Sequence, residues 1–352
     1  MLCPEDMYFL TINPIGILYI KIYNFSGKDI IMTVFSKAEI LYNKSINKKI
    51  NEADLDEIIA WPEENLSVLF ACAEQVKRHF FKSNVEPCTL MNIKSGNCSE
   101  DCAFCSQSTH SNAEIAKYDL SKPDEIIKNF RTALEKKLDF CVVSSGRKLS
   151  IEEIKTVAKA LKTVGAPSHA SLGILTDEEF AIIKDAGVVC YNHNLETGRN
   201  YFGEICTTHT IDDRIATVKK AEKAGINVCC GGIFGIGESW SDRKDLCLEL
   251  MSLDVDTVPI NFFNPVPGTR AKPPAETPME FLKIISMFRL ALPDKTIKMC
   301  GGREYHLGNL QPLVFLAGAN GYISGGYLTT RGNGIDADEK MINALGLKKG
   351  YL

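Results

Sequence analysis

Three cysteines, Cys98, Cys102 and Cys105, stand at C-x3-C-x2-C spacing directly after a short apolar, strand-like segment. Three thiolates are one ligand short of a closed metal site. An iron–sulfur cube held by three cysteines keeps its fourth iron open to a ligand that the protein does not supply, and chemistry can take place at that iron. The spacing therefore predicts a reactive 4Fe-4S cluster rather than a store of electrons.

Structural zinc is the alternative for this triplet. His110 would complete a Cys3His set, and zinc favours four protein ligands in a closed tetrahedron. Zinc knuckles, however, are usually built on paired C-x2-C units, whereas the spacing here resembles that of the radical S-adenosylmethionine (SAM) superfamily. In that superfamily SAM chelates the open iron, and an electron from the reduced cluster releases a 5′-deoxyadenosyl radical, which the protein must aim and shield from water.

The composition is typical of a globular protein that works on small molecules. The 352 residues could form one large α/β barrel or two ordinary domains, and 45% of them are hydrophobic. A net charge of −4 without a basic stripe argues against a nucleic-acid partner. Residues 7–25 are fairly apolar, but they contain Asn13, Pro14 and Lys21 and follow acidic residues, so we expect neither a membrane span nor an export signal.

The cysteine count bears on the cell compartment. Thirteen cysteines in a secreted chain would suggest disulfides, but the triplet needs free thiolates and no export signal is recognised. We therefore expect a reducing cytoplasm. Residues 1–33 are interpreted as an extension of uncertain order, with Met32 as an alternative start of translation.

From about residue 85 the chain alternates short β-branched runs with amphipathic helical stretches. Eight strands are predicted, at 89–93, 140–144, 169–172, 188–191, 227–230, 257–261, 297–300 and 321–324. Helices are predicted between them at 123–137, 151–164, 177–186, 211–224, 241–253 and 278–290. Parallel strands joined by right-handed helical crossovers close at eight, so the fold class is α/β, a (β/α)8 TIM-type barrel spanning 85–352. Residues 34–84 are predicted to form an N-terminal helical cap, with helices at 38–41 and 66–81.

Barrel enzymes work at the carboxyl ends of their strands. The unusual residues of this chain fall at or near those ends. They are the Cys triplet, Cys141, His169, the segment 192–197, Cys229 with the glycine-rich run 231–238, Asn261, Lys298 with Cys300, and residues 325–327. A buried cysteine or a turn glycine explains any one of them, but not their presence at all eight ends.

Four stretches resemble the biotin synthases, a radical SAM family. They are MNIKSGNC at 91–98, YNHNLET at 191–197, PINFFNP at 259–265 and GGRE at 301–304, and the likeness runs from about residue 41 to residue 350. The resemblance implies a homodimer that inserts sulfur between C6 and C9 of dethiobiotin. It also implies two SAM molecules per biotin, an auxiliary iron–sulfur cluster as the sulfur donor and a reducing electron donor of the flavodoxin or ferredoxin type.

The same resemblance assigns roles to four polar residues. Glu196 resembles the acidic residue that accepts hydrogen bonds from the SAM ribose, and Arg214 the residue that pairs with the SAM carboxylate, for which a guanidinium fork is well shaped. Asn194 and Asn261 resemble the pair that binds dethiobiotin, since an amide offers a donor and an acceptor to the cyclic urea. Taken alone, each could be a loop, helix-surface or turn residue.

The glycine-rich run 231–238 is not a dinucleotide fingerprint. We expect Gly231, Gly232 and Gly235 to let the backbone approach the methionine and adenine parts of SAM.

The auxiliary cluster is where this chain departs from the family pattern. Better-known members hold a 2Fe-2S cluster with three cysteines and an arginine; by strand alignment this chain offers Cys141, Cys229, His169 and, in place of the arginine, Lys298. Lysine is a poor substitute for a guanidinium ligand. Residues two apart on a strand face the same side, so Cys300 would join Lys298, while the adjacent Cys229 and Cys230 must face opposite sides. We expect Cys141, Cys229 and Lys298 to hold a cluster of 2Fe-2S type or larger, with Cys300 and His169 as further candidates; a core role for Cys300 is the alternative.

Two other functions fit the triplet. One is a different radical SAM reaction, as in methylornithine synthase or the hydrogenase-maturation enzyme, against which the pair Asn194 and Asn261 argues. The other is a non-catalytic iron–sulfur or zinc protein that serves redox sensing or scaffolding. Such a protein would yield no 5′-deoxyadenosine.

Overall fold

The computed structural model describes residues 7–12, 18–23, 33–272 and 275–350. Within the expected extension, β1 (Met7–Ile12) and β2 (Leu18–Tyr23) pair as an antiparallel hairpin in which Met7 lies opposite Tyr23. The rest of the extension, Met32 included, lies outside the described residues. Within the described part of the chain, no helix combines the length and the apolar character that crossing a membrane requires.

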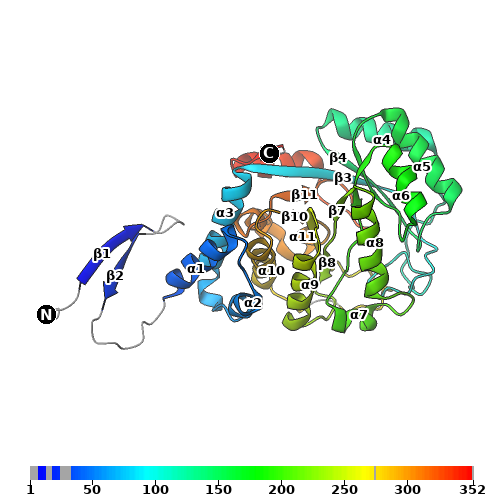
Figure 1. The fold of residues 1–352 in the computed structure, drawn as a ribbon. Helices are drawn as coiled ribbons and strands as arrows, with labels where there is room; N and C mark the ends of the chain where they lie inside the picture. Colours follow the sequence, from blue (N-terminus) through cyan, green and yellow to red (C-terminus); the bar gives the residue numbers. More distant parts are fainter. Residues whose placement is uncertain (1–6, 13–17, 24–32, 273–274, 351–352) are drawn as a thin grey trace.

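Eight parallel strands close into a barrel, as predicted (Figure 1). The ring closes because the sixth barrel strand pairs with the seventh at Thr257 and Thr296, and the eighth pairs with the first at Gly321 and Glu86. The barrel strands are β3 (Asn84–Lys94), β4 (Asp139–Ser144), β5 (Ser168–Ser171), β6 (Val188–Asn192), β7 (Asn227–Cys229), β9 (Thr257–Phe262), β10 (Thr296–Met299) and β11 (Gly321–Ile323). Besides the β1–β2 hairpin, two further short strands were not predicted: β8 (Gly232–Phe234), which extends the sheet beside β9, and β12 (Lys348–Lys349), which pairs with the start of β3.

All six predicted crossover helices are present. They are α4 (Pro123–Glu135), α5 (Ile151–Val164), α6 (Asp177–Asp185), α8 (Ile211–Lys223), α9 (Trp240–Ser252) and α10 (Pro278–Ala291). Most begin at a capping box; Ser150 and Glu153 of α5, for example, satisfy each other's backbone N–H groups. The prediction missed four short helices, α7 (Arg199–Ile205), α11 (Arg303–Leu307), α12 (Leu313–Leu316) and α13 (Ile335–Ala344).

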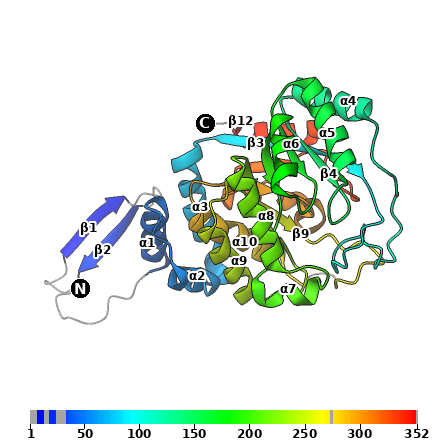
Figure 2. The ribbon, with the colours of Figure 1, turned by 45° about the vertical axis from the view of Figure 1, so that its right-hand side comes forward.

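The N-terminal cap is helical and packs against one side of the barrel. Its helices are α1 (Val34–Ile46), α2 (Glu52–Ile59) and α3 (Leu66–Phe81), so the helix predicted at 38–41 is longer than expected. Figures 1 and 2 both show these helices together beside α10. The Ser45 hydroxyl donates to the Leu290 carbonyl at 2.7 Å, and the buried Lys77 ammonium donates to the Phe315 carbonyl at 2.6 Å.

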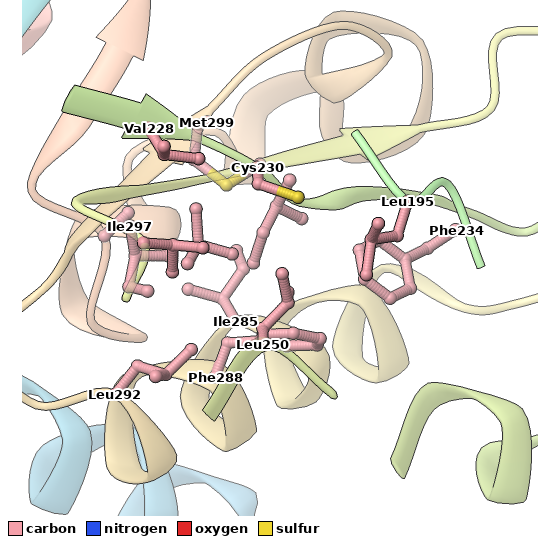
Figure 3. Packing of buried hydrophobic residues seen from close by; sticks show 14 of the residues in the cluster. Leu195, Val228, Cys230, Phe234, Leu250, Ile285, Phe288, Leu292, Ile297 and Met299 are labelled. Atoms are coloured by element: carbon pink, nitrogen blue, oxygen red, sulfur yellow. The ribbon is translucent and has the colours of Figure 1, made fainter. Parts of the chain in front are cut away.

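The two faces of the barrel strands have different chemistry. The outer faces pack against the helices in one large apolar core, where Ile297 and Met299 of β10 lie with Ile285 and Phe288 of α10 (Figure 3). Lys298, between them in sequence, is also buried, but it is not part of this apolar core. Because successive side chains of a strand alternate in direction, Lys298 faces the barrel lumen. The lumen-facing side chains therefore include the groups that can do chemistry, whereas the outward-facing side chains stabilise the fold by packing against the helices.

Candidate active site

The Cys triplet lies in the long loop between β3 and α4. The loop is held by its own backbone: the Cys98 N–H donates to the Gln107 carbonyl at 3.1 Å, and the Cys105 N–H donates to the Cys102 carbonyl at 3.1 Å. The Gln107 side-chain oxygen accepts from the Gly96 N–H at 3.3 Å and from the Asn92 amide at 3.2 Å. All three thiols are free. The sequence-predicted cluster ligands therefore lie on one fixed loop at the carboxyl end of the first barrel strand.

Acidic residues of this loop fix it to the segment that precedes α8. The Asp101 carboxylate accepts from the Thr207 N–H at 2.9 Å and from the Thr207 hydroxyl at 2.5 Å. Burial alone would raise the pKa of Asp101, but these hydrogen bonds hold it well below its usual range. Glu100 accepts from the Thr208 hydroxyl at 2.8 Å and is in close contact with His209 Nδ1. Residues 100–101 and 207–209, about 100 positions apart in sequence, thus pack together next to the triplet.

Glu196 and Arg214 lie together beside the triplet. Arg214 Nη1 is 3.5 Å from Glu196 Oε1, and the two side chains are only 11% and 14% exposed. Glu196 has a φ of 73°, a left-handed conformation that is uncommon for residues other than glycine. Burial raises the pKa of Glu196, although Arg214 and Asn194 act in the opposite direction. The Glu196 carboxylate acts electrostatically on the Cys105 thiol, and the Arg214 guanidinium acts on the Cys102 thiol.

Arg214 also holds the surrounding loops. Its Nε donates to His209 Nε2 at 3.0 Å, and its Nη1 donates to the Asn194 carbonyl at 2.7 Å. These contacts use two atoms of a guanidinium that carries five N–H donors. The Arg214 guanidinium group is therefore positioned by the protein and retains N–H donors for an anionic ligand.

Asn194 and Asn261 both hydrogen-bond to the backbone of the dipeptide Gly231–Gly232. The Asn194 side-chain oxygen accepts from the Gly231 N–H at 3.2 Å, and the Asn261 amide donates to the Gly232 carbonyl at 3.2 Å. The Asn261 oxygen also accepts from the Gly301 N–H at 3.2 Å. An asparagine amide has two N–H groups and two oxygen lone pairs. Each side chain is thus oriented by backbone contacts and keeps hydrogen-bonding capacity.

The glycines at 231 and 232 have a packing role that the sequence did not reveal. A Cβ at Gly231 would lie 2.1 Å from the Pro259 carbonyl oxygen, and a Cβ at Gly232 would lie 2.7 Å from the Glu196 carbonyl oxygen. Gly235 has a φ of 85°, and its N–H donates to the Glu238 carboxylate at 2.9 Å. Close approach between protein segments therefore already accounts for these glycines.

A layer of thiols lines the barrel lumen. Cys141, Cys229 and Cys300 are buried, at 7%, 6% and 2% exposure, and none of them is part of the apolar core. The structure adds Cys88 and Cys190, buried in the same way. His169 lies level with Cys141 on one side and with Cys190 on the other in the strand register. Among the residues that the structure describes, these five thiols thus share the lumen with the His169 imidazole and the buried Lys298.

The sequence analysis missed two members of this layer for different reasons. Cys88 precedes the predicted first strand, which began at residue 89, whereas β3 begins at Asn84. Cys190 lies inside a predicted strand, two residues before Asn192, and so shares its lumen face. Strand alternation was a usable signal for Cys190, whereas Cys88 required the true start of β3.

The charge balance of the lumen is set by Lys298. Burial lowers the pKa of Lys298, but Cys88, Cys229 and Glu86 together raise it well above its ordinary value. Burial raises the pKa of Cys88 to about 12, and a hydrogen bond with Cys190 lowers that of Cys229. A buried ammonium among thiols can offset the negative charge of a thiolate-ligated cluster. The soft, enclosed donor set therefore fits an iron–sulfur cluster.

His110 does not join the triplet. It is exposed, whereas the Cys, His and carboxylate ligand atoms that gather within 4.8 Å of one another in the described residues belong to Cys102, Cys206 and His209. No sequence pattern pointed to Cys206 or His209, because the residues that they contact, Cys102 and Glu100, are more than 100 positions away in sequence. The zinc alternative through His110 therefore finds no support in the geometry.

Two family models match the chain: the Radical SAM superfamily over residues 92–250 and the Biotin and Thiamin Synthesis associated domain over residues 259–348. The chain is 44% identical over 300 residues to the biotin synthase of Desulfatibacillum aliphaticivorans, an alignment that covers 84% of this chain and 92% of that protein. It is 43% identical over 305 residues to the biotin synthase of Citrifermentans bemidjiense, covering 85% and 93%.

Solved structures share the fold at lower identity. Methylornithine synthase matches with a TM-score of 0.78 at 21% identity, covering 88% of this chain and 97% of that chain. The FeFe-hydrogenase maturase HydG from Carboxydothermus hydrogenoformans matches with a TM-score of 0.74 at 15% identity, covering 90% and 79%. At these identities the likeness bears on the fold alone.

Proposed function

Because this chain belongs to the biotin synthase family of radical SAM enzymes, we propose that it converts dethiobiotin to biotin by inserting sulfur, with two SAM molecules cleaved per biotin. The observation that carries the proposal is the pairing, in one barrel, of a Cys triplet loop at the strand ends with a layer of buried lumen thiols. When bound, a 4Fe-4S cluster at the triplet supplies the electron that cleaves SAM, and an auxiliary cluster supplies the sulfur atom.

Cys98, Cys102 and Cys105 would hold the 4Fe-4S cluster. The loop fits this group because its thiols are free and its backbone is fixed at both Cys98 and Cys105. Glu100 and Asp101, two of the residues between the first two cysteines, bind Thr208 and Thr207 and so fix the loop from its other side. The protein's contribution here is to fix the position of the open iron.

SAM would be held by the charged pair next to that loop. Arg214 would bind the SAM carboxylate through donors that its protein contacts leave over, and Glu196 would accept hydrogen bonds from the ribose hydroxyls. The left-handed backbone of Glu196 aims its carboxylate, and Asn194 is its neighbour. Segment 231–235 would line the same site through its backbone.

Dethiobiotin would be recognised by Asn194 and Asn261. Both amides are pinned by the Gly231–Gly232 dipeptide, so little side-chain entropy is lost when a cyclic urea binds. The urea offers N–H donors and a carbonyl acceptor, which match the remaining capacity of the two amides. In this proposal the substrate would lie between the SAM residues and the lumen thiols, where the reaction requires it.

The auxiliary cluster would be held in the lumen by Cys141 and Cys229, with Lys298 as ligand or counter-charge. Cys88, Cys190 and Cys300 face the same space, and His169 lies at the same level. This thiol-rich set favours a cluster larger than 2Fe-2S. A chain with so many free buried thiols also suits a reducing compartment, so we place it in the cytoplasm, as a homodimer served by a flavodoxin or ferredoxin-type reductant.

Anaerobic reconstitution tests the proposal. Iron and sulfide counts with Mössbauer spectra should reveal two distinct clusters, and addition of SAM, a strong reductant and dethiobiotin should yield 5′-deoxyadenosine and biotin. A protein that forms no 5′-deoxyadenosine would be a scaffold rather than an enzyme. Formation of 5′-deoxyadenosine without biotin would assign the barrel to another radical SAM reaction.

A further inference from the structure

Cys206 and His209 form a cluster of ligating atoms that the proposed reaction does not use. Cys206 Sγ lies 3.8 Å from Cys102 Sγ and 3.8 Å from His209 Nε2, and all three residues offer ligand atoms within 4.8 Å of one another. Cys206 is 3% exposed and His209 is 7% exposed. Two thiols and an imidazole, largely withdrawn from water, make a soft donor set.

The spacing suits one tetrahedral ion. Zinc–sulfur bonds of about 2.3 Å and zinc–nitrogen bonds of about 2.0–2.1 Å imply tetrahedral edges of roughly 3.8 Å between sulfurs and roughly 3.5 Å between sulfur and nitrogen. The observed 3.8 Å between Cys102 Sγ and Cys206 Sγ matches the first edge. Cys206 Sγ lies 3.8 Å from His209 Nε2 and 3.3 Å from His209 Nδ1, so the thiol must shift toward Nε2 to reach the second edge. The ligands of a cube diverge from its separate corners, so Cys206 at this distance from Cys102 is not suited to be a fourth cube ligand.

The surroundings of His209 also fit metal binding. Glu100 contacts His209 Nδ1, which is the carboxylate–histidine arrangement that fixes the tautomer of a metal ligand and leaves the other ring nitrogen free to bind. That nitrogen, Nε2, accepts a hydrogen bond from Arg214 Nε at 3.0 Å. An ion at Nε2 would replace only this hydrogen bond, because Arg214 keeps its contact with the Asn194 carbonyl.

We propose that the cluster-free protein binds one Zn²⁺ ion through Cys102, Cys206 and His209, with water in the fourth position. Binding converts two thiols to thiolates and releases their protons to solvent. Because Cys102 is shared, the ion and the 4Fe-4S cluster exclude each other, a consequence that rests on the proposed role of Cys102 as a cluster ligand. Zn²⁺ at this site therefore blocks assembly of the SAM-cleaving cluster.

The test uses the full-length chain, free of clusters, kept anaerobic and reduced with a phosphine. Co²⁺ serves as the spectroscopic probe and Zn²⁺ as the competitor, and spectra are compared as wild type minus variant because the lumen thiols can also bind metal. Wild type should bind one Co²⁺ more than Cys206→Ser, with thiolate-to-cobalt charge transfer and intense tetrahedral d–d bands. Zn²⁺ affinity at this site should fall by about 100-fold or more in Cys206→Ser and in His209→Gln, and by about 10- to 100-fold in Glu100→Gln.

Cys105→Ser is the matched control, because it lies in the triplet but outside the trio. Cys105→Ser should keep the Zn²⁺ site and lose the 4Fe-4S cluster. Cys206→Ser should lose the Zn²⁺ site and still assemble the 4Fe-4S cluster. Cys102→Ser should lose both. Unchanged metal binding in both Cys206→Ser and His209→Gln would overturn the inference, as would equal Zn²⁺ losses in Cys105→Ser and Cys102→Ser. If the reconstituted wild-type protein forms no 5′-deoxyadenosine while the Zn²⁺ site behaves as stated, the proposed function fails and the metal site stands.

Discussion

Cys229 and Cys230 are consecutive residues at the end of β7, yet they belong to different parts of the protein. Cys229 faces the lumen, where Lys298 and Cys190 act on its thiol. Cys230 points into the apolar core beside Val228, Met299 and Leu195 (Figure 3). The alternation of strand side chains predicted this opposition, and the pair provides a matched experiment on the auxiliary cluster.

Cys229→Ala should lower the iron and sulfide bound after reconstitution and abolish biotin formation, since it removes a lumen thiolate. SAM cleavage at the triplet should persist. Cys230→Ala removes one sulfur atom from the core and should lose no iron, at a cost of about 1–2 kcal/mol in the free energy of unfolding. Equal iron contents in the two variants would show that Cys229 is not a cluster ligand.

Cys102→Ala should abolish 5′-deoxyadenosine production, because the triplet would keep only two thiolates for the SAM-binding cluster. The ultraviolet–visible and electron paramagnetic resonance spectra of that cluster should disappear with the activity. Cys247→Ala, at a thiol buried in α9, is the control and should leave both unchanged. Wild-type 5′-deoxyadenosine yield from Cys102→Ala with a normal cluster spectrum would contradict the assignment.

The barrel could be predicted from sequence because most of its strands are short and apolar and six periodic helices lie between them. All eight barrel strands and six crossover helices were located to within a few residues, with β3 the least accurate at its start. β8 was missed because Gly232 and Phe234 lie in a glycine-rich run that carries no strand period. Its pairing with β9 depends on glycine, since the Cβ of a larger residue at 232 would meet the Glu196 carbonyl.

The site was only partly predictable, since sequence spacing reports neighbours along the chain but not across it. The triplet is local, so C-x3-C-x2-C was sufficient to find it. The contact between Cys102 and Cys206 joins loops 104 residues apart, and it forms only when Asp101 and Glu100 bind the segment at 207–209. No motif in either loop alone indicates that contact.

Asn261→Ala should weaken dethiobiotin binding by roughly 5- to 150-fold, because leaving a buried hydrogen-bonding partner unsatisfied costs about 1–3 kcal/mol. SAM binding should change much less, since Asn261 contacts Gly232 and Gly301 rather than Arg214 or Glu196. Equilibrium binding of each ligand to the reconstituted enzyme measures both. Equal losses for the two ligands would assign Asn261 to general support of the barrel mouth.

Gly231→Ala should destabilise the cluster-free protein by about 1–3 kcal/mol, because its Cβ would lie 2.1 Å from the Pro259 carbonyl oxygen and the strands would have to shift. Gly203→Ala is the control, for which the free energy of unfolding should change in the opposite direction. Gly203 lies in α7 with open space around its Cβ position, so alanine should stabilise the protein by about 0.5–1 kcal/mol. Urea-induced unfolding of both variants measures the difference. A stable Gly231→Ala protein would show that this segment adapts, and would leave SAM approach as the reason for the glycine.

Lys298→Met should affect the cluster and the cluster-free fold differently. Without a cluster, methionine fills a similar volume but leaves Glu86 without its neighbouring cation, so the free energy of unfolding at pH 7 should fall by about 1–3 kcal/mol. With a cluster, the thiolate charge loses its buried counter-ion, so auxiliary iron and sulfide should fall while SAM cleavage persists. Lys298→Arg keeps the positive charge and is the control; it should retain more auxiliary iron than Lys298→Met. Iron and sulfide counts are compared with urea unfolding of the cluster-free variants. Normal auxiliary iron in Lys298→Met would show that the lumen cluster needs neither the charge nor the nitrogen of Lys298.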